Sequence, residues 1–217
     1  MESQIMNDEI ARVARAMGHP MRVRILDVLA QGERNVDELS RRLATPLTTL
    51  SSQLKVLREA RLVTTRREGT KIHYAVADPS ILKLLLALRS VAEHRSAEVQ
   101  RVVFDFVHEI EGLEAVTAAE MAELIDLDKV AVIDVRPRDE YDAGHIPGAI
   151  SVPLDQLRQR ARKFPRGQQI VAYCRDAYCV LAPEAVRELH QLGFGSSRLE
   201  IGFTEWAAEQ HPIAREA

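Results

Sequence analysis

The stretch Ile170-Val-Ala-Tyr-Cys-Arg-Asp-Ala-Tyr-Cys-Val180 runs from an apolar segment into a polar one and contains both cysteines of the chain. A continuous apolar run of this length is typical of a strand buried on both faces of a parallel sheet. The polar residues that follow predict a loop at the carboxyl end of that strand. Backbone N–H groups of such a loop, and the N-terminus of a following helix, can hold a thiol as its thiolate. Cys174 is therefore the candidate nucleophile.

The length and composition of the chain limit the kinds of protein in which this thiol could act. The 217 residues, with a mass of 24.4 kDa, are enough for one large domain or two small ones, and we expect two. The longest strongly apolar run, Ile81 to Leu88, is far shorter than the roughly 20 residues of a membrane span. The first residues lack the basic and apolar regions of a signal peptide. We therefore expect a cytoplasmic protein with no membrane partner, whose thiols are reduced or transiently modified.

Charge is distributed unevenly along the chain. Residues 1–78 carry 13 Lys/Arg and 10 Asp/Glu, a net charge of +3, which leaves 16 and 22, a net charge of −6, for residues 79–217. A basic surplus of this size is weak support for nucleic-acid binding, because most charged residues are simply solvated. A DNA-binding motif in the same residues is needed to support this interpretation.

Three short helices are predicted in the first third. His19-Pro20 opens a helix that runs to about Ala30, and Asn35 caps a second helix, to Leu43, with Glu38 at capping-box spacing. Thr45-Pro46 then predicts a cap and a proline at the first position of a third helix. The buried side of that helix is predicted from apolar residues at steps of three, four and three: Leu47, Leu50, Leu54 and Leu57.

The other side of the third helix has the chemistry of a recognition helix. Short polar side chains there can approach base edges and phosphates without steric conflict. The candidate DNA-binding residues on it are Thr48, Ser52 and Lys55, with Thr49, Ser51 and Gln53 beside them. After it, Leu62–Arg67 and Lys71–Val76 alternate as strands around a turn at Gly69, which predicts a hairpin carrying Arg66, Arg67 and Lys71.

This order of elements resembles the winged helix-turn-helix of ArsR-type bacterial repressors, and Leu54-Lys-Val-Leu-Arg-Glu-Ala-Arg-Leu-Val63 is very similar to that family's segment. The resemblance covers about residues 8–110, with Gln53 where many relatives carry His and Arg61 where they usually carry Gly. It implies an α+β domain over residues 1–111 that binds duplex DNA. A plain helical bundle with a solvated polar face is the alternative.

Metal sensing, which some members of that family perform, finds little support in the residues. The segment Asn35–Leu39 before the recognition helix has no thiol, so a soft-metal site there is excluded. His94, Asp105 and His108 match a zinc site on the later helix only in part, and zinc usually takes four ligands. We assign no metal and no cofactor, and zinc near these three residues stays open.

A largely helical segment of more than thirty residues is predicted from Asp78-Pro79 to about Glu111. Its many apolar positions, from Ile81 to Ile110, must be covered by another surface. The family resemblance implies a homodimer built on this segment and the N-terminal helix. A homodimer places two recognition helices about 34 Å apart, which suits a two-fold symmetric operator.

A second domain is expected over residues 117–217, after a linker at Gly112–Thr117. Val130–Val135 and Gln169–Tyr173 read as buried parallel strands, with helical pieces between and after them. The ordered motifs that follow resemble a rhodanese domain, a sulfurtransferase-like α/β fold with a parallel sheet. They are Asp134-Val-Arg136, Glu140-Tyr141, Gly144-His-Ile-Pro-Gly-Ala-Ile150, Pro153, Tyr173-Cys174 and Leu199-Glu-Ile-Gly-Phe-Thr-Glu-Trp206.

The rhodanese resemblance implies that Cys174 carries sulfane sulfur as a persulfide, taken from a small donor such as thiosulfate or polysulfide. Inward backbone N–H groups would stabilise the negative charge, and such thiols have pKa values lowered to about 3.5–7.5. Arg175 either holds an anionic donor or pairs with Asp176. Asp134, Arg136, Glu140 and His145 are expected to be structural.

Cys179 departs from the family pattern, because the sixth residue of a rhodanese loop is often Arg or Ser. It could attack a persulfide on Cys174 and leave a disulfide, the two sulfurs could be bridged by further sulfur atoms, or Cys179 could be a small buried residue. Closure requires Cα atoms within about 7 Å.

Two functions follow. One is a DNA-binding transcriptional repressor that senses reactive sulfur through Cys174, with Cys179 as resolving thiol. The other is a sulfurtransferase that carries a DNA-binding or dimerisation module, so enzymatic activity stays open. The operator, the inducing molecule and the direction of the response cannot be read from the sequence.

Overall fold

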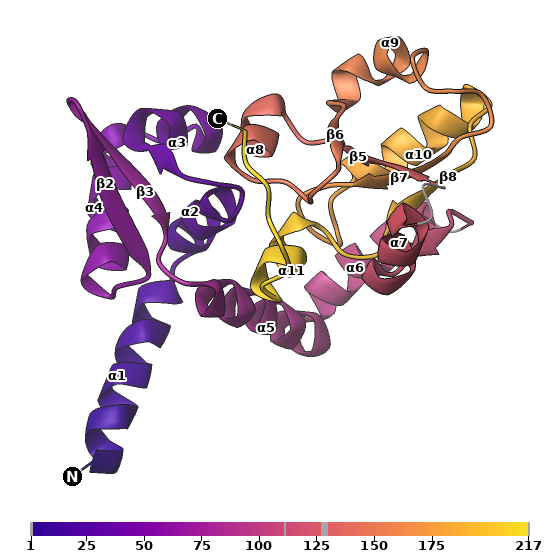
Figure 1. The fold of residues 1–217 in the computed structure, drawn as a ribbon. Helices are drawn as coiled ribbons and strands as arrows, with labels where there is room; N and C mark the ends of the chain where they lie inside the picture. The colour runs from indigo at the N-terminus through magenta and orange to yellow at the C-terminus, as the bar shows by residue number, and fades with distance from the viewer. Residues whose placement is uncertain (1, 111, 127–129, 217) are drawn as a thin grey trace. The chain divides into compact units, whose positions relative to one another are not determined.

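The computed structural model describes residues 2–110, 112–126 and 130–216, which fall into two compact units (Figure 1). The first is Met1–Leu85 and the second Leu86–Ala217, so that the division falls within helix α5. Each unit has its own core. The domain limits expected from the sequence, 1–111 and 117–217, stay a prediction.

The first unit is a winged helix-turn-helix, as expected. Its helices are α1 (Glu2–Met17), α2 (Pro20–Ala30), α3 (Val36–Leu43), α4 (Leu47–Glu59) and the start of α5 (Pro79–Arg95). Its strands are β1 (Arg34–Asn35), β2 (Val63–Glu68) and β3 (Lys71–Val76). They form an antiparallel sheet in the order β1-β3-β2, and β1 was not foreseen. Gly69 takes a positive φ of 58° in the two-residue turn between β2 and β3.

Local signals in the sequence explain where these helices begin. The Asn35 side chain accepts from the amides of Asp37 and Glu38, and Glu38 accepts from the Asn35 amide, so the predicted capping box is confirmed. The start of α4 differs from the prediction. Pro46 has ψ 144°, outside the helix, and the Thr45 hydroxyl donates to the Leu43 carbonyl instead of capping α4.

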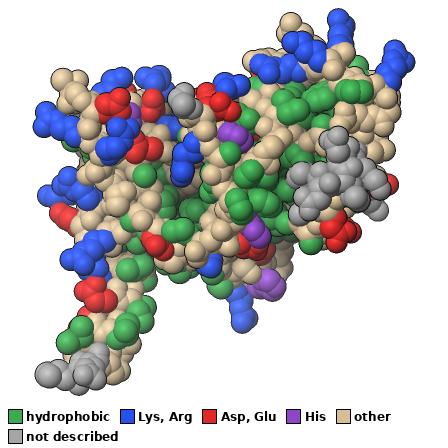
Figure 2. Space-filling model, viewed as in Figure 1, with side chains coloured by type: hydrophobic (Ala, Val, Ile, Leu, Met, Phe, Trp, Pro, Cys, Tyr) green, Lys and Arg blue, Asp and Glu red, His purple; other side chains and the backbone are tan. Residues whose placement is uncertain are grey.

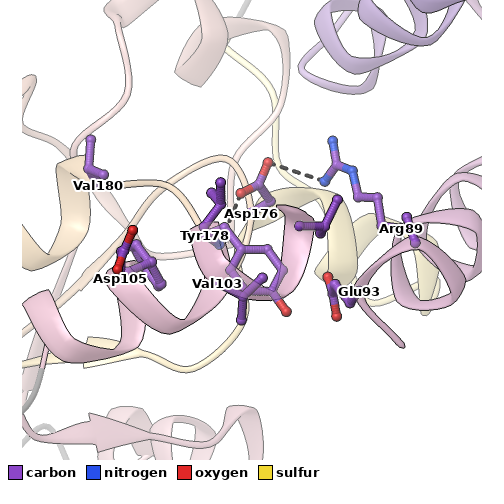
Figure 3. Close-up of a pocket in the computed structure, with 11 residues that line it drawn as sticks. Arg89, Glu93, Val103, Asp105, Asp176, Tyr178 and Val180 are labelled. Carbon is purple, nitrogen blue, oxygen red and sulfur yellow. Dashed lines mark hydrogen bonds and ion pairs between the residues drawn. The ribbon is translucent and has the colours of Figure 1, made fainter. Parts of the chain in front are cut away.

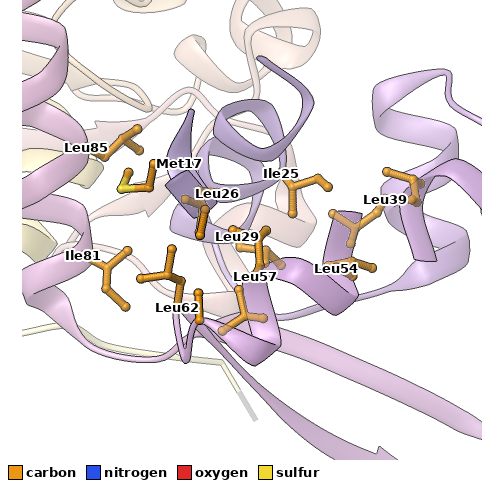
Figure 4. Close-up of a cluster of buried hydrophobic side chains, with 14 of the residues drawn as sticks. Met17, Ile25, Leu26, Leu29, Leu39, Leu54, Leu57, Leu62, Ile81 and Leu85 are labelled. Atoms are coloured by element: carbon orange, nitrogen blue, oxygen red, sulfur yellow. The ribbon is translucent and has the colours of Figure 1, made fainter. Parts of the chain in front are cut away.

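The core of the first unit joins the inner sides of its helices (Figure 4). Leu50, Leu54 and Leu57 of α4 are buried within it, as predicted, but Leu47 is 45% exposed. This part of the prediction was wrong because α4 begins only at Leu47, so that residue lies at the end of the buried stripe. Ile81 and Leu85 of α5 are also buried in this core.

The single long helical segment predicted after Asp78 is two helices, α5 and α6 (Ala97–Glu109). Ser96 separates them, and its side-chain oxygen accepts from the Val99 amide at 3.3 Å, which caps the new helix. None of the described helices combines the length and the apolar character needed to cross a bilayer.

The second unit contains an α/β domain with a parallel sheet of strand order β4-β8-β7-β5-β6. The strands are β4 (Ala115–Val116), β5 (Val130–Asp134), β6 (Ile150–Ser151), β7 (Gln169–Tyr173) and β8 (Ser196–Leu199). The helical elements are α7 (Ala118–Asp126), α8 (Arg138–Ala143), η1 (Leu154–Gln156), α9 (Leu157–Ala161), α10 (Leu181–Gln191) and α11 (Phe203–Ala208). β4 lies in the stretch expected to be a linker.

Two apolar clusters cover the two faces of this sheet, and β7 alternates between them. Ile170, Ala172 and Cys174 belong to the cluster that includes residues of α9 and α10. Val171 and Tyr173 belong to the cluster on the other face, with residues of α7, α8 and α11. The period of two along a strand thus directs Cys174 and Tyr173 to opposite faces.

A buried polar network joins the carboxyl ends of β5 and β7. Arg136 pairs with Asp134 at 2.6 Å, both side chains being 0% exposed, and also donates to the Gly144 carbonyl at 2.7 Å. The Tyr173 hydroxyl donates to Asp134 at 2.7 Å. Burial, and then the charge of Asp134, raise the pKa of Tyr173 well above its usual value, which keeps this donor protonated. The network fixes the platform from which the cysteine loop leaves the sheet.

Replacing Asp134 with Asn should destabilise the second unit by about 3–5 kcal/mol, because it removes the carboxylate that pairs with the buried guanidinium of Arg136. Asp142→Asn is the matched control, since Asp142 pairs with Arg138 on the surface, and it should cost less than about 1 kcal/mol. Urea unfolding followed by the fluorescence of Trp206, the single tryptophan, reports on this unit. Equal losses for the two variants would contradict the assigned role of the buried pair.

Candidate functional site

Cys174 follows directly after β7 and is 2% exposed. Cys179 lies two residues before α10 and is half-buried. The Cα atoms of the two residues are 6.1 Å apart and their sulfurs form a disulfide. This distance lies within the usual range for a bridge. The bridge therefore closes the loop between a strand and the following helix, a possibility that the sequence had left open.

Three amides of this loop donate to partners other than Cys174, contrary to our expectation. Those of Tyr178 and Cys179 donate to Asp176, to its carboxylate and its carbonyl respectively, both at 3.1 Å. The Ala177 amide donates to the carboxylate of Glu205 at 3.3 Å. A disulfide carries no negative charge for these amides to stabilise, so carboxylate and carbonyl oxygens take them instead.

Glu205 holds the loop from the side of α11. Its carboxylate accepts from the amides of Ala177 and Gly202, at 3.3 and 3.0 Å. Burial raises the pKa of this carboxyl, although both amide hydrogen bonds act in the opposite direction. Glu205 stands three residues after Gly202, at capping-box spacing, and this signal was available in the sequence but was not used.

Arg175 does not pair with Asp176, which was one of the two roles that we considered for it, and its role in holding an anionic donor stays a prediction. Its guanidinium forms a bidentate pair with Glu140, at 2.7 and 2.9 Å, and not with Asp176. Glu140 is only 1% exposed, so the pair with Arg175 offsets part of the cost of burying its charge. In this state Arg175 anchors the loop to α8. Glu140 was expected to be structural, and its contacts agree with that role.

Gly202 lets the segment before α11 pass directly against the cysteine loop. A Cβ atom at this position would overlap the backbone N and Cα of Asp176. No other residue type fits without moving the loop. The Phe203 amide then donates to the Cys174 carbonyl at 2.9 Å, and the Thr204 amide to the Arg175 carbonyl at 2.8 Å.

On its other side the loop contacts α5 and α6. Arg89 of α5 donates to Asp176 at 3.3 Å, and the ring of Phe106 of α6 packs edge-on against Tyr178, with centroids 5.7 Å apart. Burial, and then a hydrogen bond to Glu93, raise the pKa of the Tyr178 hydroxyl. Nothing in the sequence motifs pointed to these contacts, which join residues more than 70 positions apart.

A cavity of about 610 Å³ lies along this contact (Figure 3). Its lining residues are Arg89, Ala92, Glu93, Val99, Val102, Val103, Asp105, Phe106, Asp176, Tyr178 and Val180. All of them belong to the second unit. Cys179 is flanked in sequence by two of them.

The residues considered for zinc do not assemble in the described part of the chain. No group of three His, Cys, Asp or Glu side chains is placed there to hold a metal ion. His94 bonds to the Ser90 carbonyl at 2.7 Å, Asp105 lines the cavity, and the side chain of His108 lies outside the described residues.

The polar side of α4 is exposed at five of the six positions identified from the sequence. These positions are Thr48, Thr49, Ser51, Ser52 and Lys55. Gln53 differs, because it is half-buried and its side-chain oxygen accepts from Arg22 at 2.9 Å.

The hairpin of β2 and β3 carries exposed basic residues, and Figure 2 shows Lys and Arg side chains over this hairpin and α4. Arg66 is held by Glu33 and Glu68, at 2.6 and 2.8 Å, which raise the pKa of its guanidinium. Arg67 donates to the Gly69 carbonyl at 3.1 Å, and Lys71 is exposed. Arg66 is thus already paired within the protein.

Comparison with known proteins agrees with this two-part organisation. A helix-turn-helix domain model matches residues 17–66, and a rhodanese-like domain model matches residues 117–209. The HTH-type transcriptional regulator Rv0324 of Mycobacterium tuberculosis is 40% identical over 206 residues, which span 95% of this chain and 90% of that protein. A biofilm growth-associated repressor of Agrobacterium fabrum is 42% identical over 83 residues, 38% of this chain and 71% of that protein.

Solved structures resemble the chain over one part at a time. The homodimeric winged helix-turn-helix DNA-binding domain of Mb0332 from Mycobacterium bovis is 36% identical, with a TM-score of 0.41, over 44% of this chain and 88% of that one. A rhodanese-related protein of Thermoplasma volcanium is 29% identical, with a TM-score of 0.41, over 46% of this chain and 97% of that one.

The helix-turn-helix and the hairpin come first in the sequence, and the cysteine loop with its parallel sheet comes last. The Rv0324 regulator aligns with both parts, over 95% of this chain. The chain therefore belongs to the family of ArsR-type helix-turn-helix transcriptional regulators with a C-terminal rhodanese-like domain.

Proposed function

We propose that this regulator is a repressor whose affinity for its operator is set by the sulfur chemistry of Cys174 and Cys179. The observation that carries the proposal is the 6.1 Å separation of their Cα atoms, which lets one loop exist either as two thiols or as one disulfide. A loop tied at both ends takes one conformation when bridged and is free to take others when reduced.

The chemistry begins with the reduced protein. The Cys174 thiolate attacks the sulfane sulfur of a donor such as thiosulfate, which forms a persulfide on Cys174 and releases sulfite. The Cys179 thiol then attacks the γ-sulfur of Cys174, which closes the disulfide and expels the outer sulfur as HS⁻. Two electrons pass from the two cysteines to the sulfur that leaves.

The alternative function, a sulfurtransferase with a DNA-binding module, requires the persulfide to survive until an external acceptor arrives. Cys179 competes with that acceptor from within the same loop, which favours sensing over turnover. Thiocyanate formation from thiosulfate and cyanide, lost in Cys174→Ser and unaccompanied by any change in DNA affinity, would favour the enzyme instead.

Helix α5 supports a route from the loop to the DNA-binding unit. Ile81 and Leu85 of this helix are buried in the core of the first unit, and Arg89, one turn later, pairs with Asp176 of the loop. Opening the loop would move Asp176 and so release the end of α5. Allosteric coupling of about 1–3 kcal/mol corresponds to a change of roughly 5- to 150-fold in affinity.

Duplex DNA bound by a homodimer is the partner that fits this unit. Apolar residues Ile5, Met6 and Ile10 of α1 are each about 60% exposed, as an uncovered dimerisation helix would be, and Figure 2 shows apolar side chains on α1. The M. bovis relative is described as a homodimer. We propose that Thr48, Thr49, Ser51, Ser52 and Lys55 approach the major groove, and that Arg67 and Lys71 contact phosphates.

Wild-type protein should change its DNA affinity by roughly 5- to 150-fold when the disulfide is reduced with dithiothreitol. Cys174→Ser and Cys179→Ser, which cannot form the bridge, should bind equally with and without dithiothreitol. The measurement is fluorescence anisotropy on a duplex selected from a random-sequence pool by the wild-type protein. Identical affinity of the bridged and reduced wild type would rule out the proposed switch.

Arg89→Ala should leave disulfide formation intact but reduce the effect of reduction on DNA affinity, because Asp176 loses its contact with α5. Arg95→Ala, at the exposed end of the same helix, should behave as wild type. Both are measured by the same anisotropy assay, with the bridge counted by mass spectrometry. An undiminished response in Arg89→Ala would exclude this route.

Lys71→Gln should weaken binding to specific and non-specific duplexes alike, and should lower the slope of log affinity against log salt by about 1, because one phosphate contact is lost. Lys163→Gln, an exposed lysine of the second unit, is the control and should change neither quantity. Salt titrations of both variants test this, and an unchanged slope in Lys71→Gln would remove the hairpin from the interface.

A further inference from the structure

The 610 Å³ cavity beside the cysteine loop has the size of a small-molecule site, for which about 300–1,000 Å³ is usual. Most of its lining side chains are apolar, from Ala92, Val99, Val102, Val103, Phe106 and Val180. Val102 is 68% exposed although it lines the cavity, so a small molecule can enter from solvent. Tyr178 and Val180, the two neighbours of Cys179, form part of the wall.

Charge around the cavity is unfavourable to anions. Among the described lining residues, three carboxylates, those of Glu93, Asp105 and Asp176, stand against one guanidinium, that of Arg89. Arg89 already pairs with Asp176. Figure 3 shows these charged groups around the ring of Tyr178.

The loop adds no free cation of its own. Its arginine, Arg175, is held in a bidentate pair by Glu140. A dianion such as thiosulfate would therefore approach a site that is net negative, which lowers its local concentration. An uncharged donor meets no such barrier and gains from apolar contact.

We propose that this cavity binds uncharged, apolar sulfane-sulfur compounds, such as organic trisulfides, and presents them to the cysteine loop as its oxidant in preference to thiosulfate. The inference rests on the proposed function and names the class of donor. With diallyl trisulfide, the Cys174 thiolate attacks an outer sulfur, forms a mixed disulfide and expels the allyl persulfide anion. The Cys179 thiolate then attacks Cys174, closes the bridge and expels allyl thiolate. The two electrons lost by the cysteines reside on the two anions released.

The test compares the rate of bridge formation in reduced, full-length protein, followed by mass spectrometry after alkylation. Wild type should react at least about 10-fold faster with diallyl trisulfide than with thiosulfate at low salt. Val103→Trp, which fills the cavity, should lose this preference. Val91→Trp, an exposed position on α5 outside the cavity, should keep it.

A second variant and a binding measurement test the inference independently, in case Val103→Trp does not fold. Asp105→Lys replaces an exposed lining carboxylate with a cation, so it should lower the ratio of the trisulfide rate to the thiosulfate rate several-fold at low salt. Diallyl sulfide, which has the same arms but no sulfane sulfur, should bind wild type and Val91→Trp in saturation-transfer NMR, and should not bind Val103→Trp.

Three results would overturn the inference. The first is equal rates with the two donors in wild type, and the second is diallyl sulfide binding to Val103→Trp as well as to wild type. The third is a changed oligomeric mass of Val103→Trp with an unchanged donor preference, which would assign the cavity to contact with a second copy of the chain. The proposed function fails separately. If a bridge formed with diamide leaves DNA affinity unchanged, the switch is wrong whatever the cavity binds.

Discussion

The buried pair of Asp134 and Arg136 is the constraint on which the second unit depends. Both charges are fully removed from solvent, so neither can lose its partner without a large cost. The pair also engages the hydroxyl of Tyr173, the last residue of β7, and the carbonyl of Gly144. It thereby fixes where β7 ends relative to β5. Cys174 comes next in the chain, so this buried network sets where its side chain leaves the sheet.

The loop that follows is held by many weak contacts and one strong one. Glu140, Glu205 and Arg89 each hold it from a different helix, while the disulfide ties its two ends. Breaking the disulfide therefore removes a restraint from a loop that contacts three helices, α5, α8 and α11. That arrangement fits the proposed sensor, because an allosteric coupling of about 1–3 kcal/mol through α5 would correspond to a change of roughly 5- to 150-fold in affinity. It suits a turnover enzyme less well, since the second thiol competes with any external acceptor.

Local patterns predicted the fold well, and long-range pairing limited the prediction of the site. The capping box at Asn35 and the apolar spacing of α4 depend on residues a few positions apart, so the sequence displayed them. The partner of Arg175 did not follow from its neighbours, because Glu140 lies 35 positions away on α8. Leu47 was misplaced for another reason: the helix begins one residue later than Pro46 suggested. The two cysteines predicted the loop as the site, but their spacing in the sequence is compatible both with a disulfide and with two separate thiols.

In the proposed mechanism the redox state of the Cys174–Cys179 bridge sets DNA affinity, so the two follow one equilibrium. A redox titration of the wild-type protein in dithiol buffers, with the bridged fraction and the affinity for a fixed duplex measured on the same samples, tests it most directly. Both quantities should change together, with one midpoint potential. DNA affinity that stays constant while the bridge passes from fully formed to fully reduced would contradict it.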